Sequence, residues 1–200
     1  MGKIIAVVSG KGGTGKTTFT SCIGFALASM GKKVLCLDCD ISLRNLDLAL
    51  GLSDSALMDF SDVLSGRCTL EQAVVSHPKY PSLFLLAAPL AYDGFRVEPE
   101  QAAALMGEII AGFHAGYANG KVHLVVNRVA KKLLRQLHTT IDDAMDAAGL
   151  PLLGVVPEDG DIPRCLNQGV PLCDDNYYAA RAFYNIARRI AGYKIPLMKI

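Results

Sequence analysis

A glycine-rich loop near the N-terminus constrains the fold of this chain more than any other feature. The loop occupies residues 10–18 and reads Gly-Lys-Gly-Gly-Thr-Gly-Lys-Thr-Thr. It follows an apolar, β-branched run at residues 4–8, which is typical of a buried parallel strand. After the loop the apolar residues take a helical spacing, at Phe19, Ile23, Leu27 and Met30. A strand, a glycine loop and a helix in this order predict a phosphate-binding P-loop.

Each residue type in the loop has a role in binding phosphate. Glycines allow backbone N–H groups to converge on phosphate oxygens, and the helix N-terminus adds partial positive charge. We predict that Lys16 reaches the β- and γ-phosphates and that Thr17 offers its hydroxyl to Mg²⁺. The predicted nucleotide-binding residues of the loop are Gly12, Gly13, Thr14, Gly15, Lys16, Thr17 and Thr18. The alternative is a glycine-rich turn without a ligand, which would leave a pattern that is rare by chance unexplained.

Composition indicates one soluble globular domain over residues 1–200. The chain is 51% hydrophobic and 20% charged, which suffices for a sizeable core. Its net charge of +1 gives no general attraction to nucleic acid, so we expect no nucleic-acid partner. The longest apolar run, residues 83–91, contains Pro89 and is too short to cross a bilayer. No signal-peptide pattern is seen at the N-terminus, and we expect a cytoplasmic protein.

The six cysteines have neither the spacing of a zinc site nor that of a secreted disulfide framework. Cysteines spaced in this way are typical of a protein in a reducing compartment. Cys36 and Cys39 match C-x-x-C, but they fall in an apparent strand, where residues three apart point to opposite faces. We therefore do not expect a redox role for this pair.

A second buried-strand pattern at residues 34–38 completes a strand–helix–strand unit, which predicts a parallel sheet with a right-handed crossover. Asp38 and Asp40 come at the carboxyl end of this strand, the edge where open α/β sheets bind ligands. One carboxylate could hold Mg²⁺ through water, and the other could orient the water that attacks the γ-phosphate. The alternative is that both aspartates only cap a helix.

These residues resemble the deviant Walker A family of MinD and ParA dimerising ATPases. The resemblance rests on the extra lysine, Lys11, and on residues 38–47, which are similar to the family's switch I. It implies that Lys11 reaches the partner subunit's nucleotide, that Asp40 positions the attacking water and that Asp38 supports the magnesium site. From the residue alone, Lys11 can equally be a solvated lysine of the loop. The run at residues 43–47 resembles the MinD branch and its flagellar-placement relatives more than the DNA-partitioning ParA proteins. From its residues alone it is a polar turn with leucines packing inward.

Strand and helix patterns alternate along the rest of the chain. Strands are predicted at residues 82–88, 122–127 and 150–157, and helices at residues 98–112 and near the C-terminus. The resemblance implies that Asn127 reads the adenine edge and that the loop with Pro157 and Asp159 walls the adenine pocket. Asparagine at a strand end can equally be a turn residue.

One helix is predicted to begin near Lys131 and to continue as far as Met145. Its apolar face would hold Leu133, Leu134, Leu137, Ile141 and Met145. A basic cluster on it, at Lys131, Lys132, Arg135 and His138, could contact anionic lipid or a partner, although a solvated face explains it more simply.

The resemblance breaks after Phe113. The family continues there with a strand that ends in the Asp-x-Pro-Ala-Gly switch II, then a helix and a further strand, and none of these is present. Both strands would flank residues 4–8. Either the sequence omits residues between positions 113 and 114, or the fold is contracted by two strands and hydrolysis is doubtful. Residues 193–200 are also too short for the amphipathic membrane helix with which MinD proteins typically end.

We therefore predict a doubly wound, mostly parallel α/β P-loop NTPase of the MinD/ParA type. The resemblance implies ATP/ADP and Mg²⁺ as cofactors, ATP hydrolysis, an ATP-dependent homodimer, and division-inhibitor and activator proteins of the Min system as partners. The protein would then position the division inhibitor at the inner face of the cell membrane. Alternatives are a flagellar-number or DNA-partitioning ParA-like ATPase and, in another class, a non-hydrolysing nucleotide-binding module.

Overall fold

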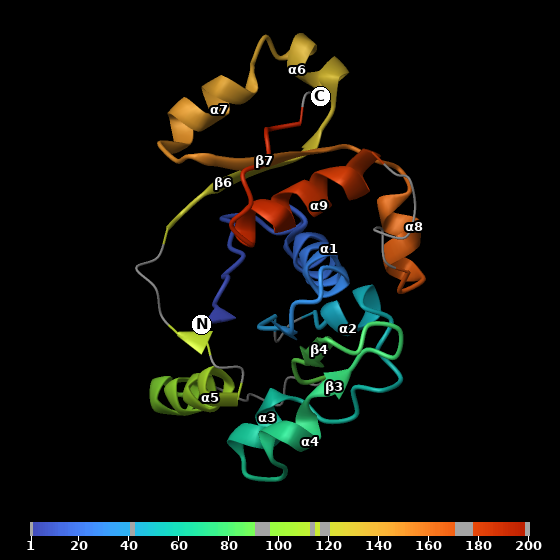
Figure 1. Ribbon diagram of the computed structural model, residues 1–200, viewed down its shortest axis with the longest axis vertical. Coiled ribbons are helices and arrows are strands. Elements are labelled where there is room, and N and C mark those ends of the chain that lie inside the picture. Colours follow the sequence, from blue (N-terminus) through green and yellow to red (C-terminus); the bar gives the residue numbers. More distant parts are fainter. Residues whose placement is uncertain are drawn as a thin grey trace.

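Helices cover both sides of short, mainly parallel strands in the computed structural model, which describes residues 2–40, 43–90, 97–112, 115–116, 121–170 and 178–198 (Figure 1). In chain order the elements are β1 (Gly2–Lys3), α1 (Lys16–Ser29), β2 (Val34–Leu37), α2 (Leu46–Ala49), α3 (Phe60–Leu64), α4 (Leu70–Ala73), β3 (Val75–Ser76), β4 (Leu83–Leu86), α5 (Pro99–Gly112), β5 (Ala115–Gly116), β6 (Leu124–Val129), α6 (Lys131–Gln136), α7 (Ile141–Ala148), β7 (Leu152–Pro157), α8 (Ile162–Asn167) and α9 (Tyr178–Ile190).

The described strands form three separate groups. In the first, β2 and β4 are parallel, with Val34 opposite Leu83, and β3 is antiparallel to β4. In the second, β6 and β7 are parallel and their register shifts twice. The third is the two-residue parallel pairing of β1 with β5. The predicted parallel α/β class is confirmed, but the expected single sheet is divided.

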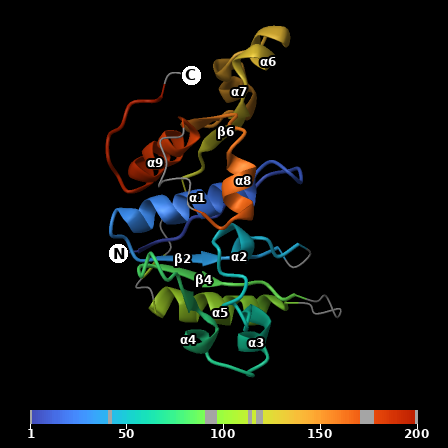
Figure 2. The same cartoon turned by 90° about the vertical axis from the view of Figure 1, so that its right-hand side faces the viewer.

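Helix α1 lies between the first two groups. Figures 1 and 2 show it with α9 and β7 on one side and β2 and β4 on the other. One side of α1 packs through Phe19, which meets the Phe183 ring edge-on at 6.1 Å between ring centroids. On the other side Phe25 belongs to a cluster with Leu83 and Leu85 of β4. The helix is therefore buried on two sides, more than the one-sided apolar pattern predicts.

The prediction of a buried strand at residues 4–8 is wrong. Strand β1 ends at Lys3, and residues 4–9 have no strand partner in the described part of the chain. Ile4 and Ile5 are exposed, and Val8 is 83% exposed. A parallel strand needs neighbours on both sides, and the two family strands that would flank this segment are missing from the sequence. In a contracted fold residues 4–8 would pair with β2 and β6 instead, but β2 pairs with β4 and β6 pairs with β7. The junction of residues 113 and 114 lies outside the described residues.

The single helix predicted from Lys131 to Met145 is two helices. Helix α6 ends at Gln136, the backbone turns at His138 with φ of 48°, and α7 begins after Thr140. Thr140 and Asp143 form a capping box, a start signal that competes with continuous helical spacing. Hydrogen bonding from Thr140 lowers the pKa of the Asp143 carboxyl. The expected apolar face is only partly covered, since Leu133 and Leu137 are exposed. The other three residues of that face are half-buried, at Leu134, Ile141 and Met145.

Helix α9 joins the C-terminal tail to the strand pair β6–β7. Ile186 is buried against Gly154 of β7, and Arg189 in the last turn donates hydrogen bonds to the carbonyls of Leu153 and Ile195, both at 2.9 Å. Burial lowers the pKa of the Arg189 guanidinium. The described helices include none long and apolar enough to cross a membrane.

Replacing Gly154 with alanine should destabilise the fold by about 1–3 kcal/mol, because a methyl group there would overlap the Ile186 side chain. Urea unfolding measures the change. Gly107→Ala in α5 is the matched control, since in the described part of the chain no atom outside the surrounding helix backbone lies within 4 Å of the added carbon, and it should stabilise by about 0.5–1 kcal/mol. In an Ile186→Ala background, the Gly154→Ala change should lower the free energy of unfolding by less. An equal cost in both backgrounds would contradict the proposed overlap.

Candidate nucleotide site

The glycine loop ends where α1 begins, as the sequence predicts. Gly15 is the N-cap of α1 with φ of 96°, and Gly13 has φ of 71°, so both positions favour glycine. Among the described residues no side chain caps the N-terminus of the helix, and its first turn contains no acidic residue. The first N–H groups of α1 therefore remain available at an exposed loop, an arrangement that binds anions.

Ser9 closes the loop across its base, and sequence reasoning did not single it out. Its hydroxyl donates to the Lys11 carbonyl at 2.8 Å and lies 2.7 Å from the Thr14 hydroxyl. The Lys16 ammonium donates to the same Ser9 oxygen at 3.4 Å. Lys16 therefore already turns back over the loop, where a phosphate would lie in the predicted site.

Asn127, at the carboxyl end of the predicted strand, contacts the loop from the other side. Its Nδ2 donates to the Thr14 carbonyl at 2.9 Å, and its Oδ1 accepts the Arg128 N–H at 2.9 Å. The strand itself continues two residues further than predicted, to Val129. The residue chosen for an adenine contact is thus brought to the P-loop backbone.

The loop after β7 lies beside the end of β6. Pro157 is buried and pairs with Val129, and the Glu158 N–H donates to the Val129 carbonyl at 3.0 Å. Asp159 accepts the N–H groups of Asp161 at 3.0 Å and Ala179 at 3.5 Å. The predicted residues Pro157 and Asp159 therefore lie on the same side of the molecule as Asn127.

Asp38 and Asp40 follow β2, and their carboxylates organise the next turn. Asp38 is 8% exposed, and its two oxygens accept the N–H groups of Asp40 at 3.0 Å and Leu46 at 3.1 Å. Asp40 is exposed and accepts the Leu43 N–H at 3.2 Å. Asp38 thus accepts the first N–H of α2, which is the helix-capping role that the sequence left as the alternative. Each Asp38 oxygen has a second lone pair, so a role toward water or metal is compatible with these bonds.

An ion pair is buried directly after these aspartates. Arg44 Nε lies 2.8 Å from Asp47 Oδ2, and the two side chains are 6% and 7% exposed. Arg44 also donates to the Ala56 carbonyl at 2.7 Å. Of the leucines expected to pack inward from this turn, Leu46 is buried, but Leu43 is exposed because the turn directs it to solvent.

Of the C-x-x-C cysteines only Cys36 lies in β2, where it is buried; Cys39 comes after the end of the strand and is exposed, so the two do not share a strand as expected, and both are free. Burial raises the pKa of the Cys36 thiol to about 12, and it also raises the pKa of Cys39, with a contribution from Asp38. Both thiols therefore stay protonated near neutral pH, which disfavours redox chemistry.

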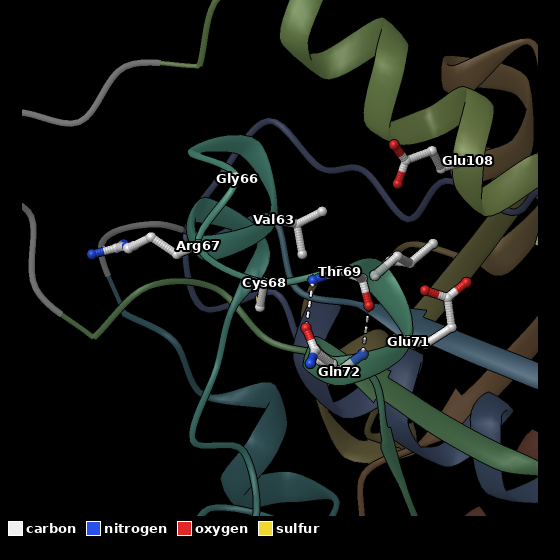
Figure 3. Close-up of a pocket in the computed structure, with 9 residues that line it drawn as sticks. Val63, Gly66, Arg67, Cys68, Thr69, Glu71, Gln72 and Glu108 are labelled. Carbon is white, nitrogen blue, oxygen red and sulfur yellow. Dashed lines mark hydrogen bonds between the residues drawn. The ribbon is translucent and has the colours of Figure 1, made fainter.

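A separate cleft of about 800 Å³ lies away from this site. It is formed beside α3 and α4, and Glu108 of α5 faces it (Figure 3). Among its lining residues Thr69 and Gln72 bond each other as a capping box. None of the predicted nucleotide-binding residues lines this cleft.

The described residues also contain no cluster of three His, Cys, Asp or Glu side chains that could hold a metal.

Replacing Arg44 with methionine should destabilise the fold by about 3–5 kcal/mol, because Asp47 would remain buried without its partner. The measurement is urea unfolding, and Arg44→Met with Asp47→Leu should recover much of the loss. Arg67→Met is the matched control, since Arg67 pairs with Asp62 at 2.8 Å but is 66% exposed, and it should cost less than about 1 kcal/mol. Similar losses for the two single variants would count against a buried pair.

Comparisons with known proteins show the family and the fold of the chain. Residues 5–172 match the model of the CobQ/CobB/MinD/ParA nucleotide binding domain. The septum site-determining protein MinD of Synechocystis is 34% identical, with 99% of this chain and 92% of the relative covered. The MinC:MinD cell division protein complex of Aquifex aeolicus aligns over 100% of this chain and 99% of that chain, with a TM-score of 0.82 and 30% identity. MinD from Pyrococcus horikoshii, complexed with Mg-ADP, covers 96% of this chain and 97% of its own, with a TM-score of 0.71 and 25% identity.

The alignments also bear on the break in the sequence. The match to the Synechocystis protein extends over 247 positions, whereas the chain has 200 residues, so at least 47 positions have no counterpart here. These relatives thus carry residues within the matched span that this chain lacks. With a family model that matches residues 5–172 and identity of about 30% over nearly the full length, the chain belongs to the MinD family of septum site-determining P-loop ATPases.

Proposed function

We propose that this chain binds Mg-ATP and Mg-ADP at the P-loop. The observation that carries the proposal is the uncapped N-terminus of α1 behind a glycine loop over which Lys16 is folded. A triphosphate would take the free N–H groups as donors, and Lys16 would replace its contact with Ser9 by one to a phosphate oxygen. A homologous MinD structure contains Mg-ADP, which supports the choice of ligand.

Thr17 and Asp38 are the residues proposed to support Mg²⁺. The ion would neutralise phosphate charge, and its preference for oxygen ligands fits a hydroxyl and a carboxylate. Thr17 lies in the first turn of α1, and Asp38 keeps unused lone pairs on both oxygens. The exposed carboxylate of Asp40 is proposed to orient the attacking water. Pro157 and Asp159 are proposed to border the base.

In the cell, we propose a role in division-site selection. The support is the similarity to septum site-determining MinD proteins and to a MinD solved with MinC. An ATP-dependent homodimer, contact with a division inhibitor and an activator, and attachment at the inner membrane surface belong to the same proposal. A DNA-partitioning role has less support, because the aligned ParA structure from Chlorobium tepidum is only 18% identical and this chain carries a net charge of +1.

A second candidate is a nucleotide-binding module that does not hydrolyse ATP. The observation that favours it is the break after Phe113, where the family's switch II is absent from the sequence. In this candidate the P-loop binds nucleotide, but no switch II backbone senses the γ-phosphate. Turnover at saturating Mg-ATP separates the two candidates, since binding is expected in both.

Lys16→Ala should abolish binding of Mg-ATP and Mg-ADP, because the ammonium that would contact the β- and γ-phosphates is removed. Titration calorimetry on the full chain gives the measurement. Lys79→Ala is the matched control, since Lys79 is an exposed lysine outside the loop, and it should bind like the wild type. Wild-type affinity in the Lys16 variant would refute the assignment of the P-loop.

Lys11→Ala should retain Mg-ADP binding but remain monomeric in ATP, because Lys11 is proposed to enter the partner subunit's site. Light scattering in ATP and in ADP gives the measurement, and the wild type should dimerise in ATP alone. An ATP-dependent dimer of this variant would argue against the proposed role of Lys11.

A further inference from the structure

We propose that Asn127 is a positioning residue that holds the P-loop in its phosphate-binding form and so acts on the phosphates through the Thr14 carbonyl. The inference rests on the proposed nucleotide binding and adds to it a function for a residue otherwise expected only to read the base. Thr14 and Asn127 are 113 positions apart in the sequence, and their hydrogen bond joins β6 to the loop.

The orientation of the Asn127 amide is fixed by two different partners. Nδ2 faces an acceptor, the Thr14 carbonyl, and Oδ1 faces a donor, the Arg128 N–H. The flipped amide would oppose oxygen to oxygen and N–H to N–H, so only one orientation satisfies both groups. Arg128 has φ of 56°, a left-handed conformation that turns the chain directly after Asn127.

The loop backbone passes close against this amide. A Cβ atom at Gly15 would lie 2.5 Å from Asn127 Nδ2, so glycine is needed there for a steric reason as well as for its φ of 96°. In the described part of the chain, the other side-chain hydrogen bonds to the loop start within residues 9–16, at Ser9, Thr14 and Lys16. Asn127 therefore supports the loop from outside.

This support matters more here because the segment before the loop is unpaired. Residues 4–9 have no strand partner among the described residues, so no sheet fixes the N-terminal side of the loop. Besides the bonds that Ser9 makes across its base, the loop is held by α1 at one end and by Asn127 in its middle. Converging N–H groups bind phosphate well only if their positions are fixed before the ligand arrives.

The two roles of Asn127 predict different selectivity. If Asn127 supports the loop, loss of its side chain should weaken the binding of every ligand that has the phosphate chain, whatever its base. If Asn127 contacts the base, the loss should weaken the binding of adenine nucleotides alone. Loss of one neutral hydrogen bond corresponds to about fivefold in affinity.

The test is titration calorimetry with Mg²⁺ and three ligands, ATP, GTP and inorganic tripolyphosphate. The full-length wild type is compared with Asn127→Ala and Asn127→Ser, at a temperature well below the melting point of each variant. Asn167→Ala is the matched control, since Asn167 is an exposed asparagine at the end of α8. The serine variant is a second truncation, too short to reach the carbonyl, in case the alanine variant does not fold.

We expect both Asn127 variants to bind all three ligands about fivefold more weakly, with equal ratios, and the Asn167 variant to match the wild type. A loss confined to ATP would make Asn127 a base reader and overturn the inference. Unchanged affinities for all three ligands would overturn it too. If the wild type bound none of the ligands, the proposed nucleotide binding would fail first, and the support role would fall with it.

Discussion

The two-sided burial of α1 is the packing on which the rest of this structure depends. Phe19 joins the helix to α9, and Phe25 joins it to the cluster over β4. Gly24 lets it approach β2 closely, since a Cβ atom there would lie 2.7 Å from the Cys36 sulfur. Because α1 contacts β2 and β4 directly and packs against α9, which in turn contacts β7, it links β2–β4 to β6–β7 although those strands do not pair with each other. The same helix carries the P-loop at its N-terminus, so one packed element fixes both the core and the site.

The helices and strands that could be predicted from the sequence are those that local interactions determine. The strands β2, β4 and β7 follow from short apolar runs, because a strand buried on both faces is apolar throughout. The run at residues 4–8 has the same composition and is not a strand, because pairing needs neighbours that only the rest of the chain can supply. The break between α6 and α7 could have been predicted, since Thr140 and Asp143 have the spacing of a capping box.

The residues of the candidate site likewise include some that the sequence predicts and some that it does not. The start of α1 directly after the glycine loop and the position of the two aspartates after β2 could be predicted, because motif spacing and apolar runs are local signals. Ser9 and the pairing of Arg44 with Asp47 were missed, although short spacing could have pointed to the latter. The contact of Asn127 with Thr14 could not be predicted from spacing, because it joins residues far apart in sequence and depends on a left-handed turn at Arg128.

The missing segment affects the two halves of an ATPase site unequally. The groups that would hold a nucleotide come from α1, β2, β6 and the loop after β7, and all of these are present and in contact or adjacent. The groups that would respond to a γ-phosphate belong, by family resemblance, to the strand and loop that the sequence lacks after Phe113. Binding draws its free energy from many fixed N–H donors and one ammonium, whereas hydrolysis also needs a backbone placed at the terminal phosphate. A chain with only the first half should therefore bind nucleotide and lose turnover, and the two properties should separate in this protein more sharply than in relatives that keep both halves.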